Sequence, residues 1–167
     1  MIVCVRKMAL LLAFAASARE APAATQIVQV NASVSKPLSL TRIQDLDLGQ
    51  IILGPGTWTN ATVSISRTGT FSCSSANLTC SGAPQAAGYT VTGTNNAVVR
   101  VTAPNILLTN QSDPSKTLTL TVDSPTTVTL PNSGTKGADF SLGGSITVSS
   151  TTAGGNYAGT FNVTVDY

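Results

Sequence analysis

The feature that most constrains the fold is a strict alternation of side chains. Between residues 156 and 167, every second position carries an apolar residue or glycine, and the positions between are mostly polar. A period of two places successive side chains on opposite faces of a strand, whereas a helix would repeat every 3.6 residues. The same pattern recurs at 28–34, 38–40, 61–65, 87–91, 99–101, 118–122, 128–130, 140–142 and 146–148. It predicts antiparallel strands with one buried face and one hydrated face.

Turn-forming residues separate these segments. Clusters of Gly, Pro, Asn and Ser occur at 54–56, 68–69, 81–82, 93–96, 131–134 and 154–156. Short alternating strands at such spacing favour two antiparallel sheets packed face to face as a β-sandwich. Gly143 and Gly144 are expected to be turn or bulge residues. Since no repeat and no linker is visible, we expect residues 25–167 to form a single domain.

The first 24 residues have the layout of a secretory signal peptide. Arg6 and Lys7 precede an apolar stretch at 8–16, and small residues follow with candidate cleavage sites ending at Ala18 and Ala23. The apolar stretch is much shorter than the roughly 20 residues that span a bilayer. We therefore expect the mature chain to begin near Thr25, to be exported to the periplasm or cell surface, and to keep no membrane span.

Charge gives no sign of a nucleic-acid partner. The chain has 9 basic and 7 acidic residues. Loss of residues 1–24 removes three basic residues and one acidic residue, which leaves six of each. A neutral domain lacks the basic surface that phosphate backbones require. We expect no nucleic-acid binding.

Two cysteines are expected to form a disulfide. Cys4 lies within the predicted signal peptide, which leaves Cys73 and Cys80 in the mature chain. An isolated pair in an exported protein is typical of a disulfide. The alternative is a zinc site, but two thiols in a chain without histidine make a poor one. We expect no metal and no cofactor.

Catalytic residue patterns are scarce, and we expect no enzymatic activity. The absence of histidine excludes a Ser-His-Asp or Cys-His arrangement. Asp45 and Asp47 are the closest pair of carboxylates, and a glycosidase-like or cation-binding pair is the chemical alternative. Because Leu46 and Leu48 alternate with them, we interpret the aspartates as the hydrated face of a strand.

Both ends of the predicted domain have features of unprotected strands. The segment 157–167 carries no charge before Asp166, although sheet edges are usually protected by charges. Residues 25–34 also alternate and carry no charge. This second segment either pairs within its own sheet as a first strand or adds to a sheet of a neighbouring molecule.

Three segments resemble a known group. Residues 37–49 (PLSLTRIQDLDLG), 84–93 (PQAAGYTVTG) and 156–167 (NYAGTFNVTVDY) resemble an uncharacterised family of secreted bacterial domains, itself similar to spore coat protein U and chaperone–usher pilin domains. The resemblance implies an incomplete immunoglobulin-like β-sandwich that assembles by donor-strand exchange with help from a periplasmic chaperone. It also implies that Gly154 or Gly155 is the glycine upstream of the last strand.

The resemblance further assigns residues to the exchange. It implies that donor side chains come from Val28, Val30, Ala32 and Val34. It implies that the C-terminal edge strand beside the open groove carries Tyr157, Phe161, Val163, Val165 and Tyr167.

The expected function is that of a pilin-like structural subunit of a bacterial surface fibre or coat, which associates with copies of itself or with other pilin-like subunits. The alternative is a monomeric, non-enzymatic binding module of the periplasm or cell surface. A pilin predicts a missing strand and an N-terminal extension, whereas a sugar-binding module predicts a complete fold with a cleft lined by aromatic residues.

Overall fold

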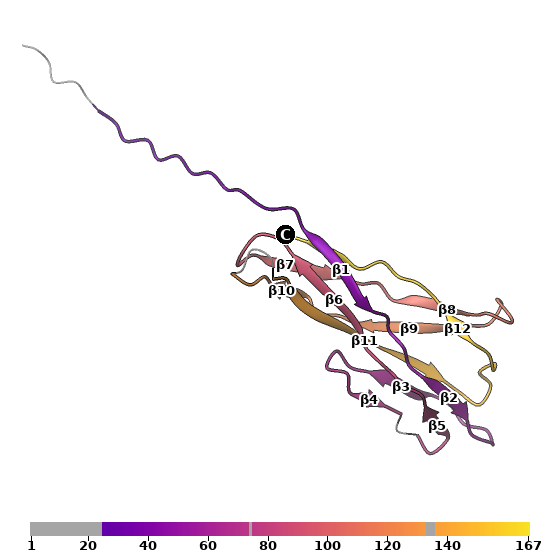
Figure 1. The fold of residues 1–167 in the computed structure, drawn as a ribbon. Helices are drawn as coiled ribbons and strands as arrows, with labels where there is room; N and C mark the ends of the chain where they lie inside the picture. The colour runs from indigo at the N-terminus through magenta and orange to yellow at the C-terminus, as the bar shows by residue number, and fades with distance from the viewer. Residues whose placement is uncertain (1–24, 74, 133–135) are drawn as a thin grey trace, which may run out of the picture. The chain divides into compact units, whose positions relative to one another are not determined.

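A computed structural model describes residues 25–73, 75–132 and 136–167 (Figure 1). The predicted signal peptide lies outside these residues. Throughout the described ranges the chain forms strands, turns and coil without helices, and so it holds no helix suited to crossing a membrane. The strands are β1 (Ser39–Gln44), β2 (Gln50–Leu53), β3 (Ala61–Ile65), β4 (Phe71–Ser72), β5 (Leu78–Ser81), β6 (Ala87–Thr92), β7 (Val98–Thr102), β8 (Ile106–Asn110), β9 (Thr117–Asp123), β10 (Thr127–Thr129), β11 (Ala138–Val148), β12 (Tyr157–Ala158) and β13 (Thr164–Asp166). The prediction of an all-β, antiparallel protein is confirmed.

The long strand β11 connects the largest sheet. Its first half, Ala138 to Leu142, pairs with β6, and its second half pairs with β3 through Gly144 to Val148. Strand β9 pairs with β11 from Gly143 to Ile146. The strand order is β1-β6-β11-β9-β8-β12, with β3 and β4 branching from β11. Two smaller sheets, β10-β7-β13 and β2-β5, complete the described part of the fold.

Gly143 and Gly144 lie inside β11 and not in a turn. They occupy the point where β11 changes partners from β6 to β3 and β9. A Cβ atom at Gly143 would collide with the backbone carbonyl oxygen of Ile65. Gly143 therefore permits a close approach of two backbones within a continuous strand, a role that the sequence pattern alone could not separate from that of a turn residue.

The first of two apolar clusters lies between the β6 and β11 layer and the sheet β10-β7-β13. Its buried members alternate along their strands, as the sequence predicts. They are Ala87, Val91, Val99, Val101, Leu130, Phe140 and Leu142. Val91, Val99 and Leu142 are completely inaccessible to solvent. We call this part of the domain the closed half.

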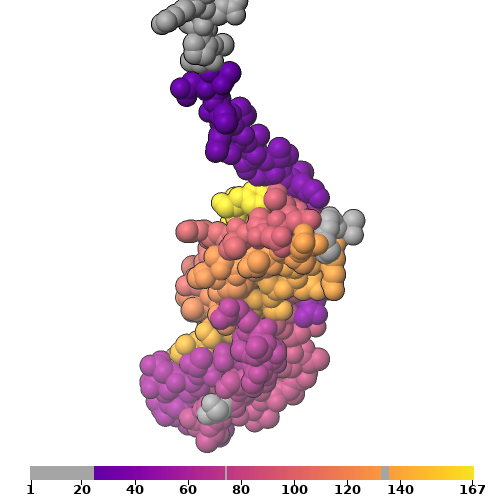
Figure 2. All heavy atoms as spheres, turned by 90° about the vertical axis from the view of Figure 1, so that its left-hand side faces the viewer, coloured from indigo at the N-terminus to yellow at the C-terminus, as the bar shows by residue number. Residues whose placement is uncertain are grey.

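The second apolar cluster lies beside the small sheet β2-β5. Its buried members are Ala61, Val63, Leu78, Leu120, Ile146 and Val148, which come from β3, β5, β9 and β11. In the space-filling view, residues 50–73 and 75–81 gather at one end of the domain (Figure 2). We call this part the open half, because a groove reaches its core.

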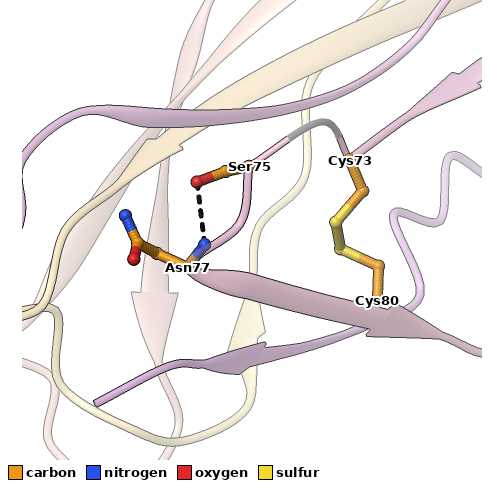
Figure 3. Close-up of a disulfide and its surroundings, with 4 residues drawn as sticks. All are labelled: Cys73, Ser75, Asn77 and Cys80. Carbon is orange, nitrogen blue, oxygen red and sulfur yellow. Dashed lines mark hydrogen bonds between the residues drawn. A yellow bond between two sulfur atoms is a disulfide. The ribbon is translucent and has the colours of Figure 1, made fainter.

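The predicted disulfide joins Cys73 and Cys80 (Figure 3). Cys73 directly follows β4 and Cys80 lies in β5, with their Cα atoms 6.3 Å apart. Within the loop, the backbone N–H of Asn77 donates to the side-chain oxygen of Ser75 at 3.2 Å. Both cysteines pack against the second cluster. The disulfide therefore attaches the covering sheet β2-β5 to the neighbouring strand pair β3 and β4.

The segment 157–167 forms two short strands where the alternation suggested one long strand. β12 pairs with β8 in the large sheet, and β13 pairs with β7 in the smaller one. Residues 159–163 connect them outside any strand. The alternating burial persists, since Tyr157, Phe161, Val163 and Val165 are half-buried and Tyr167 is exposed. The segment passes from the edge of the large sheet to the edge of the sheet β10-β7-β13. This passage interrupts its backbone pairing but not the alternation of its side chains.

Candidate binding groove

A groove of about 940 Å³ opens in the domain between two segments that are far apart in the sequence. Arg42 and residues 45–51 line one side, and residues 152–161 line the other. Leu53, Ala87, Tyr89, Leu108, Leu118, Leu120, Ile146 and Val148 also line it. This volume is at the upper end of the range typical of ligand pockets, and it suits an extended occupant as well as a small one.

The floor of the groove is apolar. Leu108 and Leu118 are half-buried, and Leu120, Ile146 and Val148 are buried core residues of the second cluster. The groove thus reaches the side chains that normally lie beneath a covering strand in a two-layer β fold. An apolar occupant placed here would complete the cover of this cluster.

The first wall is the connection between β1 and β2. Regular pairing of β1 ends at Gln44, and β2 begins at Gln50. Between them, Asp47 forms one isolated bridge with Gln85, with hydrogen bonds of 2.9 and 2.8 Å. Leu46 and Leu48 are half-buried and line the groove.

The aspartates of this wall are exposed, which agrees with their interpretation as a hydrated face. Asp45 forms an ion pair with Arg42 at 2.8 Å, and Asp47 accepts a hydrogen bond from the backbone N–H of Gly49 at 2.8 Å. Both carboxylates therefore have local partners in the turn. Across the described ranges, His, Cys, Asp and Glu nowhere gather into a group of three or more that could hold a metal ion.

The second wall is the segment from Thr152 to Phe161. Strand β12 pairs with β8, and the ladder stops at Ala158 and resumes in the other sheet at Thr164. Because β1 and β12 stand at the two ends of the strand order, each has an edge without a neighbouring strand in the large sheet. Of the residues that line the groove, Arg42 comes from β1, and Tyr157 and Ala158 come from β12. Side chains from both end strands of the large sheet therefore contribute to the groove.

A buried asparagine holds the second wall in place. Asn110 is 1% exposed, and its amide nitrogen donates to the carbonyl oxygen of Gly154 at 3.0 Å. Its side-chain oxygen accepts from the backbone N–H groups of Ser112 and Asp113 at 2.9 and 3.3 Å. Gly155 has a φ of 146°, a region that side chains rarely adopt, and a Cβ there would collide with Asn110. Sequence reasoning missed Asn110, because a polar residue beside a turn normally lies in solvent.

Tyr89 lines the groove from β6. Its ring stacks on Phe140 with ring centroids 5.6 Å apart. Burial raises the pKa of the Tyr89 phenol above its ordinary value of 10.0, the positive charge of Arg42 lowers it, and Asp45 raises it. Because the phenol is half-buried and lies in the groove lining, an occupant that removed its remaining solvent would raise its pKa further.

Residues 25–34, which we call the arm, precede the groove-bearing domain. The arm contains no strand, and the first strand of the chain begins at Ser39. Three predicted donor residues have large exposed fractions, 79% for Val28 and 87% for both Val30 and Val34, and Ala32 is exposed as well. Residues 25–34 are therefore not among the strands of the described sheets.

Comparison with known families gives one match. The model of a domain of unknown function, DUF4402, matches residues 38–167. Comparisons with curated proteins and with solved structures gave no match. The matched segment contains every strand described above and the whole groove, and it excludes the arm. The chain belongs to the DUF4402 family of domains of unknown function.

Proposed function

We propose that this chain is a pilin-like structural subunit of a bacterial surface fibre or coat, exported through a signal peptide and assembled by β-strand addition. In this proposal the domain is an incomplete immunoglobulin-like sandwich, and the arm of one copy fills the groove of the next. The observation that carries the proposal is a groove with an apolar floor, lined in part by residues of the end strands β1 and β12.

The groove meets the two requirements of strand addition. Among the described residues, the end strands β1 and β12 each have a partner on one side only in the large sheet, so their other sides offer backbone donors and acceptors. An apolar floor supplies sites for every second side chain of the added strand, here from Leu108, Leu120 and Ile146. A periplasmic chaperone would protect the same floor with a strand of its own before assembly.

The arm has the composition of a donor strand. Its residues at 28, 30, 32 and 34 are apolar, the intervening residues are polar, and it has no charge that burial would penalise. Burial of one valine side chain contributes about 1.5–3 kcal/mol. Burial of Val28, Val30 and Val34 together therefore offers several kcal/mol, before the loss of translational and conformational freedom is subtracted.

A peptide-binding experiment tests the proposal. The domain without residues 25–34 is mixed with a fluorescent peptide of residues 25–34, and anisotropy is measured. We expect saturable binding and a rise in the melting temperature of the domain with peptide concentration, since a ligand that binds the native state stabilises it. A matched peptide carrying Val28→Asp and Val30→Asp has the same length and should not bind.

Two results would contradict the proposal. Equal binding of the two peptides would show that apolar side chains do not select the groove. Binding of neither peptide, together with a monomeric full-length protein at all concentrations, would favour the alternative of a monomeric binding module.

A further inference from the structure

Lys36, Thr94 and Tyr167 form a hydrogen-bond network at the start of the folded domain, and none of the three lines the groove. We propose that Tyr167 is a positioning residue that fixes the boundary between the arm and the folded domain, by holding the backbone of Lys36. This role is independent of what the arm binds, and it does not rest on the proposed function.

The geometry is a closed hydrogen-bond network of three residues. The Tyr167 hydroxyl donates to the carbonyl oxygen of Lys36, and it accepts from the backbone N–H of Thr94 at 2.8 Å. The hydroxyl oxygens of Tyr167 and Thr94 lie 3.0 Å apart. The backbone N–H of Lys36 donates to the Thr94 hydroxyl at 2.7 Å. Both backbone groups of Lys36 are thus bonded to residues far away in the sequence.

Gly93 provides the space for this network. A Cβ at that position would lie 2.6 Å from the Tyr167 hydroxyl oxygen and 2.7 Å from Cδ2 of Leu38. Either distance is too short for a carbon atom without a shift of its neighbour. The lack of a side chain at Gly93 therefore leaves room for the Tyr167 hydroxyl group.

The network determines how much of the chain is free. Val34, Ser35, Lys36 and Pro37 are all exposed, and the ladder of β1 begins only at Ser39. If Lys36 were released, the boundary of the ordered chain would move from residue 36 towards residue 39. Each extended residue adds about 3.3 Å, so the arm would gain on the order of 10 Å of reach. Tyr167 thereby sets the residue at which the ordered chain begins.

The test uses the chain 25–167 and its Tyr167→Phe variant, which keeps the ring and loses the hydroxyl. We expect the amide protons of Lys36 and Thr94 to exchange about fivefold faster, because a hydrogen bond in a half-exposed network contributes modestly. Backbone order parameters from NMR relaxation should fall at residues 35–38, while the melting temperature changes little. Thr94→Ala, which removes the second hydroxyl, should loosen the same residues.

Tyr157→Phe is the matched control, because Tyr157 also donates one hydrogen bond to a backbone carbonyl, that of Ala153 at 2.8 Å. It should leave residues 35–38 unchanged. Unchanged exchange and order at residues 35–38 in Tyr167→Phe would overturn the proposal. So would equally accelerated exchange of the amides of β13, because that result would mean loss of the whole strand and not release of the arm boundary.

Discussion

The closed and open halves of the domain are built from the same strand pattern and differ in how their cores are covered. In the closed half, β13 pairs with β7, and the residues Val163 and Val165 pack against the first cluster. In the open half, the same C-terminal segment forms only two residues of strand, and a groove of about 940 Å³ reaches the second cluster. Residues 157–167 thus help to cover the first cluster, but beside the second cluster they line an open groove.

The alternation of residues 157–167 therefore determines which side chains are buried, but it does not determine which strand the segment pairs with. Phe161 packs against both clusters, yet it lies outside any strand. Its backbone lies where the segment leaves one sheet before it joins the other. The open half therefore has a buried apolar cluster whose side chains a groove still reaches.

The largest expected difference between the halves lies in core substitutions. Leu142→Ala in the closed half removes a side chain with no solvent exposure, and it should lower the free energy of unfolding by roughly 2–5 kcal/mol. Leu48→Ala at the groove wall should cost only about 1 kcal/mol, because Leu48 is half-buried and water already reaches it. Urea denaturation of monomeric protein measures both changes. Equal losses would show that the groove is closed in solution.

Removal of the disulfide should affect the open half selectively. The double variant Cys73→Ser with Cys80→Ser should lose about 2 kcal/mol, the low end for disulfides, because a short loop restricts the unfolded chain only modestly. Hydrogen exchange should accelerate first in β2 and β5, which the disulfide attaches to the domain. The amides of β7 and β10 in the closed half serve as the internal control. Uniform acceleration across both halves would mean that they do not open separately.

The smallest effect concerns the Tyr89 phenol at the junction of the two halves. Burial raises the pKa of Tyr89 in the folded state, so its contribution to stability is present below pH 10 and is lost as the pH rises further. An occupant of the groove should raise this pKa again by excluding more water. A titration followed by NMR of the ring, with and without the arm peptide, measures the change. An unchanged pKa with bound peptide would place the peptide elsewhere.

The alternating segments predicted several of the strands, although residues 28–34 alternate and form no strand in the structure. Strands β3, β6 and β9 lie within the alternating segments. Strand β2 contains Ile51, Ile52 and Leu53 in succession, and β8 contains Ile106, Leu107 and Leu108, so neither shows a period of two. Strand β4 has only two residues, and β5 depends on the disulfide and on its pairing with β2. These missed elements are defined by tertiary contacts and not by a local pattern.

The sequence indicated only part of the wall of the candidate site, in residues 157–161. The uncharged alternation of residues 25–34 and 157–167 indicated unprotected strands, which pair either within their own domain or with a neighbouring molecule. The floor of the groove could not be predicted, because Leu108, Leu120 and Ile146 meet only once β8, β9 and β11 have paired. The buried role of Asn110 and the network of Tyr167 likewise depend on residues that are distant in the sequence.

The central claim is that the arm completes the groove of another copy. Sedimentation velocity of the chain 25–167, with and without residues 25–34, tests this claim most directly. We expect the complete chain to form assemblies whose mass grows with concentration, and the shortened chain to be a folded monomer. A complete chain that stays monomeric at every concentration, with a shortened chain that unfolds, would place the arm in its own core and contradict the account.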